Sequence, residues 1–211
     1  MPTMALSVWD AFFEKAVRES LKSGTRVLDI GAGLRADDTR GNRVDKKREW
    51  IKPLLKELRY DVLDPVDTYK PDIVGDLQAM PIDDSFYDAV ICLAVLEHVP
   101  RPWDGVKEMF RVLKPGGYLF LYVPFLAPYH AEPGYYSDFW RFTDEGIKTL
   151  LYEFDDVELV PVRGPVETLA HLLPRPIHNK FFLWIGRHLD RVRKGSGKQA
   201  SGFYVTARRP A

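Results

Sequence analysis

The sequence predicts an α/β protein built on a doubly wound, mostly parallel sheet. Short apolar runs with the length of strands alternate with segments whose apolar residues recur at helical spacing. One run, residues 88–93, is apolar almost throughout, which is typical of a central strand buried on both faces. Polar motifs directly follow several of these runs, at the edge of the sheet where folds of this class bind their ligands.

The elements follow in order from local patterns. Apolar residues recur at helical spacing from residue 9 to 17, and Ser23-Gly24 marks the end of this first helix. Further helices are expected over 49–58, 103–113 and 143–151, the last with Thr143 as its N-cap. A turn is expected at 114–117. Strands are expected over 26–30, 60–64, 73–76, 88–93, 118–123, 157–162 and 203–207.

Composition limits the classes of protein to consider. The chain of 211 residues suits one domain, and its 30 basic residues equal its 30 acidic residues, so we expect no non-specific binding of nucleic acid. The sequence has no run of 18 apolar residues and no signal-peptide pattern, and we expect a soluble cytoplasmic protein. The single cysteine, Cys92, lies in an apolar run, which favours a buried inert thiol over a nucleophile.

A glycine-containing turn follows the first expected strand. Asp29 is the last residue but one of this strand, and Gly31, Ala32 and Gly33 follow Ile30. Glycines let the backbone turn tightly and approach a ligand closely. The spacing Gly31-x-Gly33-x-x-Ala36 also fits the relaxed dinucleotide fingerprint, so a nicotinamide-dependent enzyme is an alternative at this point.

Acidic residues follow the next two strands. Asp64 ends the second strand, where its carboxylate can accept hydrogen bonds from both hydroxyls of a ribose; Asp61, within the strand, is the competing candidate. Asp76, which precedes Leu77 after the third strand, can accept from an adenine amino group. A turn-forming or solvated carboxylate is the plainer interpretation of either position.

Taken together, these motifs resemble those of the class I methyltransferases of the type 11 group. Asp29-x-Gly31-x-Gly33 is similar to their first motif, Asp64 to their ribose-binding acid and Asp76-Leu77 to their adenine-contacting pair. The segments 96–99 (Leu-Glu-His-Val) and 113–117 (Leu-Lys-Pro-Gly-Gly) resemble two further hallmarks. The resemblance covers about residues 25–123. It implies S-adenosyl-L-methionine as methyl donor and a seven-stranded sheet with an antiparallel last strand.

The resemblance also implies a set of cofactor-binding residues. They are Asp29, Gly31, Ala32, Gly33, Asp64, Asp76, Leu77 and Leu93. One departure concerns the charged loop 34–48, which stands where the family usually begins a helix. The loop leaves open which groups hold the methionine end of the cofactor and whether Asp61 or Asp64 contacts the ribose.

The segment that follows the fifth expected strand is aromatic-rich and includes His130, Asp138 and Arg141. We expect His130 to act as the general base or to orient the acceptor, because its ordinary pKa lies near neutral pH; a structural histidine in a lid is the alternative. An internal ion pair is expected for Asp138 and Arg141, and a contact near the cofactor for His98. The pattern resembles type 11 relatives of sugar and cell-envelope glycan pathways, which implies a small-molecule or glycan-like acceptor, methylated at oxygen.

An insertion precedes the last strand, with an apolar face followed by a basic end. It can cover the core, cap the acceptor pocket, form a dimer interface or contact a membrane surface through residues 165–198. No His, Cys or carboxylate cluster shows metal-ligand spacing along the sequence, so we expect a metal-independent enzyme.

These patterns predict one methyltransferase domain over residues 1–211. Its parts are an N-terminal helix (1–24), a cofactor-binding core (25–123), an acceptor-side lid (124–143) and a helical insertion (165–201). The predicted function is S-adenosylmethionine-dependent methylation of a small or glycan-like acceptor. The alternatives are a nicotinamide-dependent oxidoreductase and a non-catalytic cofactor-binding protein of the same fold.

Overall fold

The computed structural model describes residues 7–36, 44–173, 180–192 and 198–211. Its centre is a seven-stranded sheet in the order β3-β2-β1-β4-β5-β7-β6. The first five strands in this order are parallel, and β7 is antiparallel to both of its neighbours. The predicted doubly wound fold and its antiparallel last strand are therefore confirmed.

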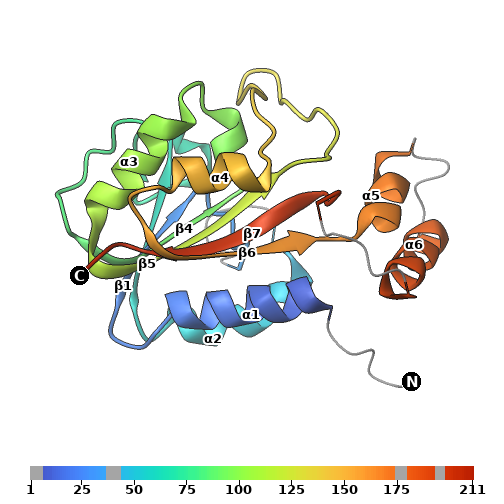
Figure 1. Cartoon of the computed structure of the whole chain (residues 1–211). Coiled ribbons are helices and arrows are strands. Elements are labelled where there is room, and N and C mark those ends of the chain that lie inside the picture. Colours follow the sequence, from blue (N-terminus) through green and yellow to red (C-terminus); the bar gives the residue numbers. More distant parts are fainter. Residues whose placement is uncertain (1–6, 37–43, 174–179, 193–197) are drawn as a thin grey trace.

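The strands in chain order are β1 (Arg26–Ile30), β2 (Arg59–Asp64), β3 (Ile73–Val74), β4 (Tyr87–Leu93), β5 (Leu113–Pro124), β6 (Asp155–Val162) and β7 (Gly202–Arg208). The α-helices are α1 (Val8–Ser20), α2 (Lys52–Leu55), α3 (Pro102–Val112), α4 (Asp144–Leu150), α5 (Pro165–Leu172) and α6 (Lys180–Val192). Helices α1 and α2 cover one face of the sheet and α3 and α4 the other (Figure 1).

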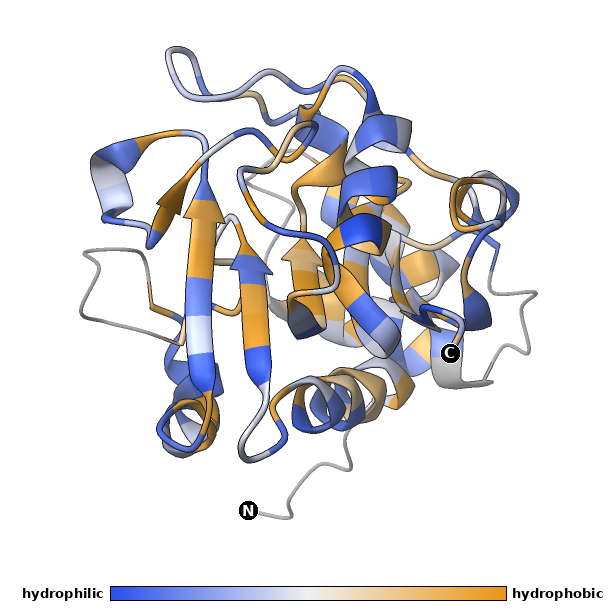
Figure 2. Ribbon diagram, turned by 90° about the vertical axis from the view of Figure 1, so that its left-hand side faces the viewer, coloured by the Kyte–Doolittle hydropathy of each residue, from blue (hydrophilic) through white to orange (hydrophobic). Residues whose placement is uncertain are grey.

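The core forms on both faces of the central strand β4. Val90, Ile91 and Cys92 are buried, as the apolar run predicts for a strand covered on both sides. Hydrophobic residues follow the strands of the sheet in Figure 2. The expected burial of Cys92 is confirmed, and this burial raises the pKa of its thiol well above the ordinary value, which disfavours the reactive thiolate.

Side-chain caps stabilise the first turns of α1 and α4. Ser7 accepts a hydrogen bond from the Asp10 backbone N–H at the start of α1, and this helix packs Phe13 against Phe120 with ring centroids 5.7 Å apart. Thr143 caps α4 as predicted, because its hydroxyl oxygen accepts from the Gly146 N–H at 3.0 Å.

The segment predicted as one helix over 49–58 is shorter and irregular. A 3₁₀ helix, Lys46–Ile51, leads into the four-residue helix α2. Pro53 explains the break, because it has no N–H to donate to the carbonyl four residues earlier and fits only the first turn of a helix. The predicted turn at 114–117 lies within β5, where Gly116 has φ 74° and the pairing with β4 shifts register.

The predicted insertion before β7 includes two helices, α5 and α6, and its residues 174–179 and 193–197 lie outside the described residues. Helices α5 and α6 lie beyond the end of β6, away from α3 and α4 (Figure 1). An ion pair between Arg187 Nη2 and Glu167 Oε1 at 2.8 Å joins the two helices, and Asp190 accepts from the Val166 and Glu167 N–H groups at the start of α5. None of the helices within the described residues is both long and apolar enough to cross a bilayer.

Candidate active site

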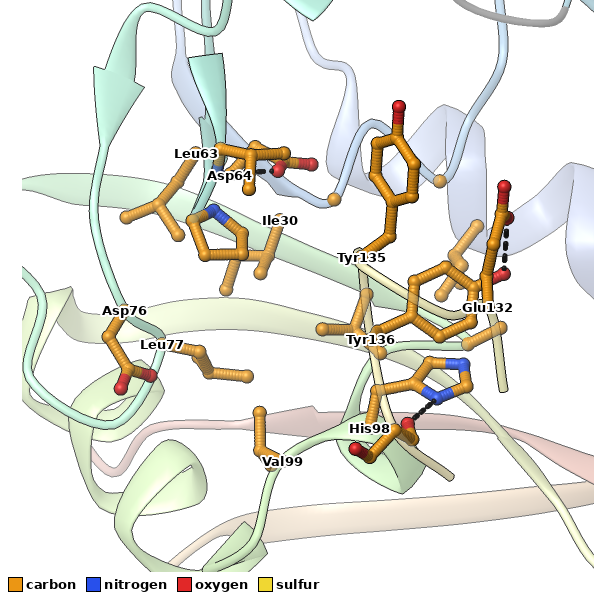
Figure 3. A pocket seen from close by; sticks show the side chains of 18 of the residues that line it. Ile30, Leu63, Asp64, Asp76, Leu77, His98, Val99, Glu132, Tyr135 and Tyr136 are labelled. Atoms are coloured by element: carbon orange, nitrogen blue, oxygen red, sulfur yellow. Dashed lines mark hydrogen bonds between the residues drawn. The ribbon is translucent and has the colours of Figure 1, made fainter. Parts of the chain in front are cut away.

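A cavity of about 610 Å³ opens at the carboxyl ends of β1, β2 and β4. The strand order reverses between β1 and β4, and this switch point is where ligands bind in open α/β sheets. Figure 3 shows Asp64 and Asp76 on one side of the cavity and His98 with Tyr136 on the other. The sheet side is formed by the expected cofactor motifs, and the opposite side by the lid.

Close packing explains the two glycines of the turn after β1. Gly31 has φ 73°, and a Cβ added there would lie 2.7 Å from Val95 Cγ2. A Cβ at Gly33 would lie 2.7 Å from Leu93 Cβ. Both glycines and Leu93 line the cavity. The turn therefore fits against the end of β4 only because these positions carry no side chain.

Asp29 organises this turn from below. Its carboxylate is fully buried and accepts from the Gly33 N–H at 3.0 Å, the Leu34 N–H at 3.1 Å and the Tyr60 hydroxyl. Burial raises the pKa of Asp29 to about 6, although the three donors act in the opposite direction. Asp29 and Ala32 lie outside the described lining of the cavity. Asp29 therefore supports the loop, and its expected contact with the cofactor stays a prediction.

The two competing carboxylates of β2 lie in different places. Asp64 is half-buried in the cavity wall, where burial raises the pKa of its carboxyl and Oδ1 accepts from the Val66 N–H at 3.1 Å. Asp61 instead accepts from the Tyr87 hydroxyl at 2.9 Å, outside the described lining. Of the two carboxylates, Asp64 is therefore the one that lines the cavity.

Asp76 and Leu77 also line the cavity. Asp76 Oδ1 accepts from the Gln78 N–H at 2.8 Å, which fixes the turn, and the Leu77 side chain is buried beneath it. Sequence reasoning assigned no role to Arg35, which lines the same cavity with a left-handed backbone at φ 50°. The feature of the sequence that could have indicated Arg35 is its position, two residues after the second glycine of the turn.

The lid is held by a bidentate ion pair. Arg141 Nη1 and Nη2 donate to the two Asp138 oxygens at 2.6 and 2.7 Å, which confirms the predicted internal pair. Arg141 also donates to the backbone carbonyls of Ala127 and Pro128. Because the guanidinium lies beside Asp138, the pKa of that carboxyl is held far below its usual range.

His130 lies in the cavity wall and is linked to the lid on several sides. Its backbone N–H donates to Asp138 at 2.8 Å, and its Nδ1 lies 3.0 Å from the Pro128 carbonyl oxygen. Its Nε2 lies 3.7 Å from Glu97 Oε1. The Glu97 carboxylate is the main cause of a raised pKa for His130.

His98 lies beside His130, with ring centroids 4.9 Å apart, and its Nδ1 lies 2.7 Å from the Ser137 carbonyl oxygen. Both imidazoles line the cavity. Glu97 is fully buried next to them, and neither of its carboxylate oxygens has a hydrogen-bond partner among the described residues. Sequence reasoning placed Glu97 in a motif but gave its side chain no role.

Comparison with known proteins agrees with this geometry. Residues 50–121 match the family model described as a methyltransferase domain. A sterol 24-C-methyltransferase of Schizosaccharomyces pombe is 28% identical over 162 residues, covering 71% of this chain and 42% of that protein. A ubiquinone biosynthesis O-methyltransferase of Pseudomonas entomophila is 32% identical over 102 residues, covering 46% of this chain and 44% of that protein.

A solved structure shares the fold over most of the chain. It is the phosphoethanolamine N-methyltransferase 2 of Haemonchus contortus, in complex with phosphomonomethylethanolamine and S-adenosylhomocysteine, with a TM-score of 0.59. It is 13% identical in sequence, and the match covers 95% of this chain and 53% of that one. The chain spans about half or less of the length of the curated relatives that it matches.

Strand order and the glycine turn define a class I methyltransferase fold. Within the chain, residues 50–121, about a third of its length, match the methyltransferase-domain model.

Proposed function

We propose that the chain is an S-adenosylmethionine-dependent methyltransferase that acts on a small-molecule acceptor. The observation that carries this proposal is the convergence of the glycine turn, Asp64 and the Asp76-Leu77 pair on one cavity that the lid borders. The relatives and the fold neighbour named above are methyltransferases, and the neighbour's structure contains S-adenosylhomocysteine.

The residues of the cavity fit S-adenosylmethionine. Gly31 and Gly33 line the cavity, where a backbone without side chains can lie close to a ligand, and the Asp64 carboxylate is suited to the two ribose hydroxyls. Asp76 can accept from the adenine amino group, beside the apolar side chain of Leu77. The guanidinium of Arg35 is suited to the carboxylate of the methionine part. When bound, the cofactor supplies an electrophilic methyl group on a sulfonium.

We propose an acceptor hydroxyl as the site of methylation. The relatives and the fold neighbour include C-, O- and N-methyltransferases, so their names do not select the atom. The position of His130 supports oxygen as the methylated atom, because an imidazole in the cavity wall can accept the proton of a hydroxyl group or orient its oxygen. Catalysis would depend largely on holding that oxygen in line with the methyl group.

A glycan-like acceptor is supported by the aromatic side chains of the lid. Tyr135, Tyr136 and Phe139 line the cavity and remain partly exposed, which offers flat apolar faces to a sugar ring. The nicotinamide alternative has less support, because that fingerprint expects an acid roughly 20 residues after the glycines and Asp64 comes later. A measurement of methyl transfer would distinguish the proposed enzyme from a non-catalytic protein that only binds the cofactor.

We also propose peripheral contact of the insertion with a membrane. Leu169, Trp184 and Leu189 expose apolar surface on α5 and α6, with exposed fractions of 62%, 56% and 48%. Flotation with anionic vesicles tests this: the chain should float with the vesicles, and Trp184→Ser should weaken the association. Recovery of all the protein in the unbound fraction would contradict it.

The proposed function is tested by calorimetric titration with S-adenosylmethionine, S-adenosylhomocysteine and NADH. We expect both sulfur compounds to bind and NADH not to bind. Asp64→Asn should weaken their binding by roughly 10- to 100-fold, the range of one or two hydrogen bonds to a charged group. Asp61→Asn is the matched control on the same strand and should bind normally. Binding of NADH alone would overturn the proposal.

A further inference from the structure

Three side chains converge at the lid side of the cavity. Glu97 and His98 lie in the 3₁₀ helix Leu96–His98 that follows β4, and His130 comes from the lid. One potential ligand atom from each residue lies within 4.8 Å of the others. Glu97 Oε1 is 3.8 Å from His98 Nε2 and 3.7 Å from His130 Nε2. These distances are too long for direct hydrogen bonds and leave space between the three groups.

Backbone contacts set the orientation of both imidazoles. His98 Nδ1 lies 2.7 Å from the Ser137 carbonyl oxygen, and His130 Nδ1 lies 3.0 Å from that of Pro128. A carbonyl oxygen only accepts, so each Nδ1 carries the proton that makes these bonds. With Nδ1 bonded in this way, the Nε2 atom of each ring lies on the side of Glu97, where it can offer a lone pair to an ion. A ring N–H donated to a backbone carbonyl is the usual support of a metal-binding histidine.

The Glu97 carboxylate is 1% exposed, and both of its oxygens are without a hydrogen-bond partner among the described residues. A buried carboxylate in this state is costly unless a cation or a donor balances it. Two imidazole nitrogens and a carboxylate that face one another can be balanced by a metal cation held between them.

We propose that Glu97, His98 and His130 form a binding site for a divalent transition-metal ion of the zinc type. Two imidazoles and one carboxylate are a ligand set of open zinc sites, and they suit neighbouring first-row ions as well. Ligands about 2.0–2.1 Å from a tetrahedral ion lie about 3.4 Å apart. The two distances from Glu97, 3.7 and 3.8 Å, exceed this by a few tenths of an ångström, and the two histidine nitrogens lie within 4.8 Å of each other and would also have to approach.

The site has an open side towards the cavity, because His98 and His130 both line it. The consequence rests on the proposed function: the ion would hold the acceptor hydroxyl oxygen and lower the pKa of its O–H group, with the proton released to solvent. His130 then orients the acceptor through the ion and does not act as the general base. The sequence-based expectation of a metal-independent enzyme is replaced by this proposal, because residues 97 and 130 come together only through the lid.

Cobalt titration of the full chain, after treatment with a chelator, tests the site. We expect Co²⁺ to bind in a one-to-one ratio with visible absorption bands, and Zn²⁺ to displace it. His130→Gln, at a partly exposed position that tolerates substitution, and Glu97→Gln should each weaken Co²⁺ binding by at least tenfold and change the bands. His188→Gln is the matched control, because His188 is exposed on α6 and lies outside the site.

Circular dichroism and binding of S-adenosylhomocysteine show whether each variant is folded. Absence of one-to-one binding, or equal binding by wild type and both site variants, would overturn the metal site and leave a proton as the occupant of the cluster. The two proposals fail separately. Cobalt binding without binding of S-adenosylhomocysteine would contradict the proposed function alone, and the reverse would contradict the metal site alone.

Discussion

The buried carboxylate beneath the glycine turn gives a quantitative prediction. Asp29→Asn keeps the shape of the side chain but replaces one acceptor oxygen with an amide NH₂. With Nδ2 at the position of Oδ2, the Tyr60 hydroxyl can rotate to accept, whereas the Leu34 N–H loses its acceptor. Leaving one buried donor without a partner costs roughly 1–3 kcal/mol of the free energy of unfolding.

The size of this loss should depend on pH. The folded-state pKa of Asp29 is raised to about 6, above the value of roughly 3.9 expected in the unfolded chain. The folded protein therefore binds more protons than the unfolded chain between these values, and the stability that Asp29 contributes is lost as pH rises through this window. Each pKa unit corresponds to about 1.36 kcal/mol, so the contribution falls by roughly 2 kcal/mol between pH 4.5 and 7.5.

Urea denaturation of wild type and Asp29→Asn at pH 4.5 and 7.5 measures this difference. The deficit in the free energy of unfolding of the variant should be larger at pH 4.5 than at pH 7.5. A deficit that is independent of pH, or that grows as pH rises, would refute the assignment of a raised pKa to Asp29. Tyr60→Phe is a useful companion variant, because it removes one donor to the carboxylate and should raise the pKa of Asp29 further.

Three further predictions concern the turn, the lid and the core. Gly33→Ala should reduce binding of S-adenosylhomocysteine by at least about tenfold in calorimetry, because its Cβ would lie 2.7 Å from Leu93 Cβ and the turn must move. His130→Ala should lower turnover at least about tenfold while the affinity for S-adenosylhomocysteine is kept. Phe13→Ala should reduce the free energy of unfolding by roughly 3–5 kcal/mol in urea titrations, because it empties a buried site between α1 and β5.

Controls distinguish these effects from general loss of structure. Gly24→Ala strains a left-handed residue at φ 77° but its added Cβ meets nothing within 4 Å, so it should lower stability and leave ligand binding unchanged. Normal ligand binding by Gly33→Ala would mean that the turn can yield without loss of the site. Unchanged turnover of His130→Ala would remove this residue from the reaction, and a loss below about 1 kcal/mol for Phe13→Ala would mean that the core closes over the gap.

The pair Asp61 and Asp64 shows where sequence reasoning stopped. Both carboxylates belong to one strand, and their spacing of three residues places them on opposite sides of it. Which side faces the ligand depends on the neighbouring strands. In the structure the hydroxyl of Tyr87, on β4, donates a hydrogen bond to Asp61. Of the two carboxylates, only Asp64, at the carboxyl end of β2, lines the cavity.

Local patterns in the sequence determined the fold class and the donor side of the site. The apolar run of β4, the cap at Thr143 and the glycines after β1 are local features, because strand burial, capping and tight turns depend on a few neighbouring residues. Pro53 was a local signal as well, because it lies in the first turn of α2 and separates this helix from the 3₁₀ helix before it.

Tertiary structure decided the features that depend on contacts between distant segments. It placed Asp29 beneath the turn and outside the described lining of the cavity, where three donors surround its carboxylate. It also brought Glu97 and His98 together with His130, because the lid folds back over the end of β4. More than 30 residues separate His98 from His130, so the sequence shows no metal-ligand motif that includes both. Only the folded chain shows that these histidines and Glu97 face one another.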